Sequence, residues 1–408
     1  MENLVKKYAK KLVDAGLGAP FGPGSPLVGG LDRDLVWNTT APEIPVLEKM
    51  FLHLNINSLV FLRPGFPYDL IIGFLAGRAL KGGGSVVPRD CETRTFLHDL
   101  PVVDRFELQA VVQALKQRKT VIVQGNEPNT KFLGPAVIAP GTVSPEQGFV
   151  HISSVCFACF VAFFSDYLAG LKSGRHDPEM DRVFDRVLPF LQNQLPASFD
   201  DLMHGPFSRE QEVYAAMVQA GRKIVDLGLV DSYFGNLSCC RHNTLYISQT
   251  GASLDELAGC IDPVPLDGSS TAGITASSEL TAHLETVART GCQVILHGHP
   301  KFCVIASMDC DPVRKAACAF ADRCHTHCPL PRHIGSVPIV PGEVGTGPFG
   351  LCNTLPRAFA ASDSVIVHGH GLFVTGKTDF IRAFSTLAAV ETSCKNRYLE
   401  QVRHLRSA

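Results

Sequence analysis

The chain has 408 residues, of which 45% are hydrophobic and 19% are charged. At about 100–200 residues per domain, this length predicts two or three domains with large apolar cores, and the composition excludes a disordered or collagen-like chain. The 37 Lys and Arg residues nearly balance the 39 Asp and Glu residues, so the formal charge of −2 predicts neither nucleic acid nor an anionic membrane as a partner.

The most apolar segment of the chain runs from 149 to 171. Polar residues such as His151, Ser165 and Asp166 interrupt it. Its charge-free part is short for a membrane span, so we predict a buried helix. The first residues lack the apolar stretch of a signal peptide, and the 14 cysteines are scattered. We therefore expect a cytoplasmic protein with reduced thiols.

Two local clusters of cysteine need separate consideration. Cys156 and Cys159 lie inside the apolar segment, where buried free thiols are common. The segment 324–328 reads Cys-His-Thr-His-Cys. It could bind metal, but it lacks the second half of a zinc-finger pattern, so we expect a loop with incidental Cys and His.

A domain boundary is predicted between 174 and 207. Asp177 opens a predicted helix that Pro196 ends, and a linker follows. Ser208, with Gln211 three residues later, forms a capping-box pattern at the start of a new helix. We therefore divide the chain into a first domain at 1–175, a helix and linker at 176–207, and a second domain at 208–408.

Predicted helices and strands alternate within the second domain, which indicates a mixed α/β domain. Short apolar or β-branched runs predict strands at 244–248, 293–296 and 364–367. Apolar residues at helical spacing predict helices at 279–289 and 378–395, the second capped by Thr378 or Asp379.

Two of the predicted strands lead directly into histidine pairs. One pair is His297 and His299, and the other is His368 and His370. Residues two apart in an extended chain point to the same face, so each pair can hold a metal ion. A catalytic site needs three protein ligands, which His297 and His299 supply together with either His368 or His370. Imidazole suits Zn²⁺ and similar ions.

Small polar turns lie close to these histidines in the sequence. They are the segments 235–238, 249–253 and 276–279. Such loops can present N–H and hydroxyl groups to phosphate oxygens, although any one of them alone is more typical of an ordinary turn.

These motifs, in this order, resemble the class II aldolase/adducin family, typified by L-fuculose-1-phosphate aldolase. The resemblance rests on five motifs over about half of the chain, at 235–238, 247–257, 277–279, 297–299 and 370–371. It implies an αβα layered domain, with a central and mainly antiparallel sheet flanked by helices.

The resemblance also implies a role for each matching residue. His297, His299 and His370 would bind Zn²⁺ or another divalent transition metal, and Glu279 would be the catalytic acid/base. His368 would then have a supporting role. The residues that would bind the substrate phosphate are Asn236, Thr250, Gly251, Ser277 and Ser278.

The implied activity is that of a lyase of carbohydrate metabolism. It would cleave a small phosphorylated sugar or related compound in a retro-aldol reaction, through a Zn²⁺-stabilised enediolate. Glu279 favours a lyase over the family's pentulose-phosphate 4-epimerases, which carry Asp there. The three histidines separate the chain from the structural adducins, which lack them.

Two alternatives remain open. The first is a family dehydratase, decarboxylase or epimerase that acts on a similar substrate. The second is a non-catalytic, adducin-like scaffold or ligand sensor. Both remain because the segment 311–350 offers no equivalent of the tyrosine that assists protonation in the aldolase. Family members usually form tetramers, so a homo-oligomer is expected.

The sequence of the first domain shows a weak similarity to that of the second. Glu43 precedes a predicted helix and then an apolar run, as Glu279 does. We hypothesise that 1–175 is a degenerate tandem copy, with an unrelated α/β domain as the alternative. Apolar runs would then align as 60–65 with 294–299 and 120–126 with 364–370. In this alignment Arg63, Gly65 and Asn126 replace His297, His299 and His370, and a dimer would imitate a tetramer.

Overall fold

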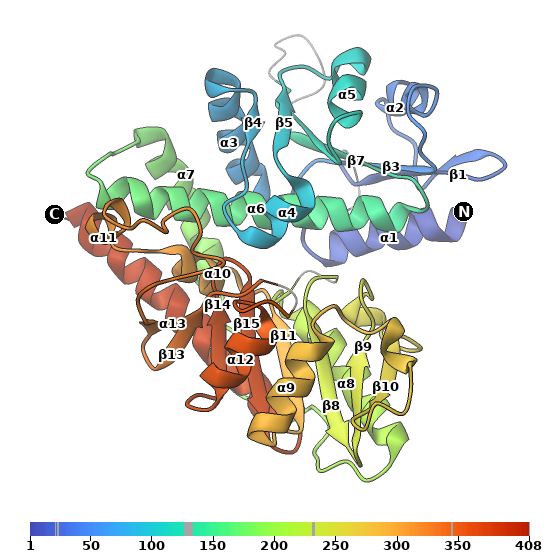
Figure 1. Cartoon of the computed structure of the whole chain (residues 1–408). Coiled ribbons are helices and arrows are strands. Elements are labelled where there is room, and N and C mark those ends of the chain that lie inside the picture. Colours follow the sequence, from blue (N-terminus) through green and yellow to red (C-terminus); the bar gives the residue numbers. More distant parts are fainter. Residues whose placement is uncertain (21, 23, 126–133, 231–232, 344–345, 408) are drawn as a thin grey trace. The chain divides into compact units, whose positions relative to one another are not determined.

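A computed structural model describes residues 1–20, 22, 24–125, 134–230, 233–343 and 346–407. They form two compact units (Figure 1). The first unit comprises Met1–Tyr167 and His176–Asn193, and the second comprises Leu168–Arg175 and Gln194–Ala408. The helix expected at 176–207 therefore belongs to the first unit as α7 (Pro178–Leu191), whereas the linker after it belongs to the second.

The second unit is built on an eight-stranded sheet with the order β10-β9-β8-β11-β15-β14-β13-β12. Its strands are β8 (Asn236–Arg241), β9 (Thr244–Ser248), β10 (Ile261–Pro265), β11 (Val294–Gly298), β12 (Arg332–Ile334), β13 (Val337–Val340), β14 (Ser364–Val367) and β15 (Gly371–Gly376). Neighbouring strands are antiparallel except β13 and β14. The expected, mainly antiparallel sheet is therefore confirmed.

Helices cover both faces of this sheet. The helices of the second unit are α8 (Glu210–Asp226), α9 (Leu280–Thr290), α10 (Lys301–Met308), α11 (Pro312–Ala316), α12 (Leu351–Phe359) and α13 (Phe380–Ser407), with the short 3₁₀ helices η1 (Leu254–Glu256) and η2 (Ala272–Ile274), and α11 is exposed rather than packed on the sheet. Buried residues of α9 and α12 pack against Ile295, Val365 and Phe373 on one face. On the other face, α8 and α13 approach Gly298. The result is the expected αβα layering (Figure 1).

The first unit has a seven-stranded sheet with the order β2-β1-β3-β7-β6-β5-β4. Its strands are β1 (Leu27–Leu31), β2 (Leu35–Trp37), β3 (Ser58–Leu62), β4 (Ser85–Val86), β5 (Leu100–Val103), β6 (Val121–Val123) and β7 (Ala136–Gly141). Besides α7, its helices are α1 (Glu2–Asp14), α2 (Ile44–Phe51), α3 (Tyr68–Gly82), α4 (Cys91–Leu97), α5 (Leu108–Leu115) and α6 (Pro145–Lys172), of which the part from Leu168 onward belongs to the second unit. Residues of α2 and α5 form a core with one face of the sheet.

Helix α6 contains the apolar segment that the sequence predicts as a buried helix. Its length and composition would allow a membrane span, but 83% of its most apolar window is buried inside the protein. Phe160, Phe163 and Phe164 are among its almost fully buried side chains. The prediction of a buried helix is confirmed.

The two sheets share one strand order. If β10 is set aside, the second sheet reads β9-β8-β11-β15-β14-β13-β12, which matches the first sheet strand for strand. The pair β5 and β6 is parallel, as is the corresponding pair β13 and β14, and the other neighbours are antiparallel in both sheets. The two units therefore have the same topology, which supports the hypothesis of a tandem copy.

The strand register corrects the expected residue equivalences. His297 lies opposite Phe373, two residues into β15. Phe61 lies opposite Ile138, two residues into β7. The register therefore matches Phe61 with His297 and Arg63 with His299. The sequence alignment of Arg63 with His297 and of Gly65 with His299 is wrong by two residues.

This error has a physical cause. A shift of two residues along a strand keeps every side chain on the same face, so the apolar pattern does not reveal it. The third predicted equivalent, Asn126, lies outside the described residues.

Several local predictions can be compared with the structure directly. The strands at 244–248 and 364–367 are confirmed as β9 and β14. Helix α13 continues to Ser407, well beyond the predicted end, and Asp379 accepts a hydrogen bond near its start. The predicted capping box of Ser208 with Gln211 is wrong by one residue, because the N-cap of α8 is Arg209 and its capping partner is Glu212. The Glu212 carboxylate accepts from the Arg209 backbone N–H at 3.1 Å and from the Ser208 backbone N–H at 2.8 Å.

Candidate metal centre

Three histidines converge in the second unit. His297 lies in β11, His299 directly follows this strand, and His370 lies in the turn between β14 and β15. One ring nitrogen of each lies within 4.8 Å of the others. The three residues are 1%, 4% and 6% exposed. The structure thus brings the predicted ligand set together.

The register and packing of β11 and β15 position His297. Its ring stacks on Phe373 with a centroid distance of 3.7 Å. Its Nδ1 lies 3.2 Å from the carbonyl oxygen of Leu372, so Nδ1–H can donate to it and leave Nε2 as a ligand atom. A Cβ atom on Gly371 would lie 2.4 Å from the Gly298 carbonyl oxygen and 2.7 Å from His297 Cε1. Close approach of the two strands therefore requires glycine here.

The environment of the triad favours neutral imidazoles. Burial lowers the pKa of His297 and of His299 well below the usual histidine value. His299 and His370 lower the pKa of His297 further, and His370 lowers the pKa of His299 further. Neutral imidazole is the form that ligates metals, so this buried set of three nitrogen donors fits a divalent transition ion.

Glu279 lies beside the triad. It occupies the N-cap position of α9 and is 5% exposed. Its Oε1 lies 3.4 Å from His370 Nε2, and its Oε2 lies 3.9 Å from His297 Nε2. Asn236 Nδ2 donates to Glu279 Oε2 at 2.7 Å. Asn236 pairs with His297 across β8 and β11, which explains how β8 brings the amide to this carboxylate.

The remaining phosphate candidates lie on two adjacent loops. An isolated bridge pairs Gln249 with Ala276, and the Thr250 N–H donates to the Thr275 carbonyl at 3.0 Å. Ser277 is buried, and its hydroxyl accepts from the Glu279 N–H at 3.3 Å. Thr250, Gly251 and Ser278 are exposed. The loops are therefore side by side, and one of them leads directly into Glu279.

The structure selects His370 rather than His368 as the third member of the triad. His368 Nδ1 lies 3.2 Å from Arg332 Nη1 and 3.0 Å from the Ser307 carbonyl oxygen. Burial and then the Arg332 charge lower the pKa of His368 to about 4. His368 therefore belongs to a neighbouring polar network, in line with the supporting role expected for it.

The Cys-His-Thr-His-Cys segment forms no comparable cluster. Within the part of the chain that the structure describes, the histidine triad is the only group with converging ligand atoms. The Cys324 thiol donates to the Ala321 carbonyl, and the Cys328 thiol donates to the Leu330 carbonyl.

His283, the partner of Ser238 from the polar segment 235–238, was missed in the sequence. Ser238 Oγ lies 2.7 Å from His283 Nδ1, and both residues are buried. Burial lowers the pKa of His283 to about 3. The His283 ring meets Phe373 edge-on, and Phe373 in turn stacks on His297. A histidine four residues after Glu279, on the same face of a helix, was the available signal.

A family model matches part of the second unit, and several solved structures match about half of the chain. Residues 215–398 match the family model described as the Class II Aldolase and Adducin N-terminal domain. This part of the second unit therefore resembles the class II aldolase and adducin family. No curated protein matches the chain.

Several solved structures resemble about half of the chain. L-fuculose-1-phosphate aldolase from Thermus thermophilus is 20% identical, with 48% of this chain and 96% of that chain covered and a TM-score of 0.36. YgbL from Klebsiella pneumoniae is 24% identical, with 49% and 100% covered and a TM-score of 0.35. A sugar-phosphate aldolase from Thermotoga maritima is 16% identical, with 47% and 96% covered and a TM-score of 0.34.

Proposed function

We propose that this protein is a metal-dependent lyase of the class II aldolase type, which cleaves a small phosphorylated sugar or related compound in a retro-aldol reaction. One observation carries the proposal. The Glu279 carboxylate lies 3.4 Å and 3.9 Å from two of three converging, buried histidines. A carboxylate beside such a nitrogen set combines a metal site with an acid/base group.

His297, His299 and His370 would hold the cation, with Zn²⁺ as the first choice for three imidazoles. When bound, the cation acts as a Lewis acid that polarises the carbonyl and hydroxyl oxygens of the substrate. The hydrogen bond from His297 Nδ1 to Leu372 fixes the ring orientation. Phe373 keeps water from the rear face of the same ring.

Glu279 would move the proton in the reaction. The hydrogen bond from Asn236 orients its Oε2 and leaves Oε1 on the His370 side. Retro-aldol cleavage removes a hydroxyl proton, breaks the adjacent C–C bond and returns a proton to the carbon left behind. A fixed carboxylate can accept the first proton and donate the second.

The two polar loops and Asn236 would anchor the phosphate of the substrate. The residues proposed for this role are Asn236, Thr250, Gly251, Ser277 and Ser278. The loops lie side by side through the bridge of Gln249 with Ala276, and the second leads into Glu279. An anchor at this point would hold the reacting carbons near the carboxylate.

We also propose that the protein is cytoplasmic and homo-oligomeric. The repeated sheet topology supports a dimer that imitates a four-domain assembly, and a tetramer is the alternative. Measurement of molar mass in solution distinguishes a dimer from a tetramer, and a monomer would contradict both.

The decisive experiment compares the metal content of the purified protein with that of a His297→Ala/His299→Ala variant. About one transition-metal ion per chain, lost in the variant, is expected. Incubation with a panel of sugar phosphates then distinguishes the reactions, because a lyase releases an aldehyde whereas an epimerase, dehydratase or decarboxylase does not. Absence of metal, even after reconstitution with Zn²⁺, would overturn the lyase and favour a scaffold or ligand sensor.

A further inference from the structure

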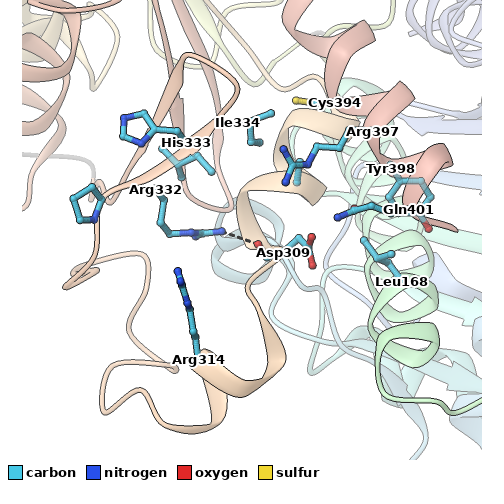
Figure 2. A pocket seen from close by; sticks show the side chains of 13 residues that line it. Leu168, Asp309, Arg314, Arg332, His333, Ile334, Cys394, Arg397, Tyr398 and Gln401 are labelled. Carbon is cyan, nitrogen blue, oxygen red and sulfur yellow. Dashed lines mark hydrogen bonds between the residues drawn. The ribbon is translucent and has the colours of Figure 1, made fainter. Parts of the chain in front are cut away.

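The second unit contains a polar pocket that shares no residue with the proposed metal centre. Its volume is about 250 Å³. Residues of α11, β12 and α13 line it together with the segment after α10, as Figure 2 shows. The lining residues that matter here are Asp309, Arg314, Arg332, Arg397, Tyr398 and Gln401.

Three arginines from three separate elements surround this space. Arg314 comes from α11, Arg332 from β12 and Arg397 from α13. Among the residues that the structure describes, none of the three forms an ion pair with a carboxylate. Converging like charges repel, so the arrangement is stabilised when an anion lies between them.

The one carboxylate of the pocket does not serve as that anion. Lys172 Nζ lies 2.6 Å from each of the two carboxylate oxygens of Asp309. Arg332 Nη2 instead donates to the backbone carbonyl of Asp309, at 2.9 Å. The Asp309 charge is therefore balanced by Lys172, and the three guanidinium groups give the pocket an excess of positive charge.

We propose that this pocket binds a phosphate group, as a second anion site of the protein. Guanidinium groups donate paired hydrogen bonds that match phosphate oxygens, and several of them can share one dianion. Tyr398 and Gln401 add polar groups from the same helix as Arg397. The volume suits a small phosphate compound rather than a nucleotide or a protein segment.

The pocket is also connected to the region of the histidine triad. Arg332 Nη1 lies 3.2 Å from His368 Nδ1, and His368 is two residues before His370. The same Nδ1 lies 3.0 Å from the Ser307 carbonyl oxygen, and one ring nitrogen cannot donate to this carbonyl and accept from Arg332 at the same time. The contact therefore shows only that the pocket adjoins the turn that carries His370.

The test measures binding of inorganic phosphate to the full-length, Zn²⁺-loaded protein by titration calorimetry. The pocket variant is Arg314→Ala/Arg397→Ala, which changes two exposed side chains. Its matched control is Arg289→Ala/Arg357→Ala, with the same change in charge on the exposed sides of α9 and α12. We expect the dissociation constant of one phosphate site to rise at least tenfold in the pocket variant and to stay unchanged in the control.

A second variant separates this site from the substrate anchor of the proposed function. Ser277→Ala/Ser278→Ala alters only the loop beside Glu279, so the pocket site is expected to persist in it. If all phosphate binding is lost in the serine variant and none in the arginine variant, the pocket proposal is overturned while the proposed function stands. Equal binding of acetate and phosphate at the pocket would also overturn it.

Discussion

The two units place different chemistry at matching points of one topology. His297 of the second unit takes part in the buried triad, whereas the register places Phe61 at the same point of the first unit. Phe61 is 2% exposed, and its ring packs against Phe106 at 5.5 Å. In the first unit a core aromatic thus occupies the position that a proposed metal ligand has in the second.

The two units also differ in what surrounds an equivalent carboxylate, that of Glu43 in the first unit and that of Glu279 in the second. Glu43 is the N-cap residue of α2, as Glu279 is of α9. Glu279 lies beside His370, whereas Glu43 Oε1 accepts a hydrogen bond from Arg63 Nη2 at 2.6 Å. Arg63 matches His299 in the register. The first unit therefore has a carboxylate at the equivalent point, paired with a guanidinium, which agrees with the hypothesis of a tandem copy.

The largest effect is expected when the second unit is given phenylalanine at the position where the first unit has Phe61. His297→Phe removes a proposed ligand but can stack on Phe373 as the histidine does. We expect loss of bound metal and a fall in activity of at least about 10³-fold, since the metal stabilises the transition state. Metal analysis and circular dichroism check this result. Retained metal in a folded His297→Phe variant would contradict the triad.

The next largest effect is expected at Glu279. Glu279→Gln keeps the hydrogen-bonding shape beside Asn236 but cannot accept a proton. We expect kcat to fall by about 10²–10⁴-fold, the usual range for a general acid/base. Metal content is expected to stay at the wild-type level, because Glu279 is proposed as an acid/base group and not as a metal ligand. Loss of metal in this variant would instead make Glu279 a ligand.

In the first unit, a substitution of the equivalent residue, Phe61, is expected to change only the stability of the protein. Phe61→Ala leaves a cavity among α2, α5 and the sheet, at a cost of about 3–5 kcal/mol in the free energy of unfolding. Denaturant titration measures this loss. Leu52→Ala, at a position 82% exposed, is the control and should change stability by less than about 0.5 kcal/mol.

The smallest effect is expected from the ion pair of the first unit. The Arg63 and Glu43 side chains are 25% and 14% exposed, so solvent screens part of their attraction. Arg63→Met is expected to cost about 1 kcal/mol of stability, between the values for exposed and buried pairs. Metal content should not change. Reduced metal binding in Arg63→Met would show that the first unit contributes to the site.

The sequence predicted the convergence of the three histidines better than it predicted the surrounding fold. His297 and His299 share one strand end, and a period of two places both rings on one side. The strand β15 was not predicted, although the Leu-Phe-Val-Thr run between Gly371 and Gly376 is typical of a strand. Its register with β11 is nevertheless what aligns Phe373 with His297.

Other features lay beyond the reach of sequence patterns. The pocket arginines Arg314, Arg332 and Arg397 come from three segments, and no periodicity links them. The equivalence of Phe61 with His297 depends on hydrogen-bonded register, which the apolar pattern leaves undetermined by multiples of two residues. The individual roles of the phosphate-loop residues stay predictions.

The ion pair of the first unit also changes how that unit responds to its surroundings. The guanidinium of Arg63 is covalently part of the chain, so no chelator can withdraw it and no shortage of metal can leave Glu43 without it. The proposed cation of the second unit is exchangeable, and its contribution to stability rises with the free metal concentration. When metal is scarce in the cell, the two units of one chain would therefore differ in stability, and the second unit would lose stability first.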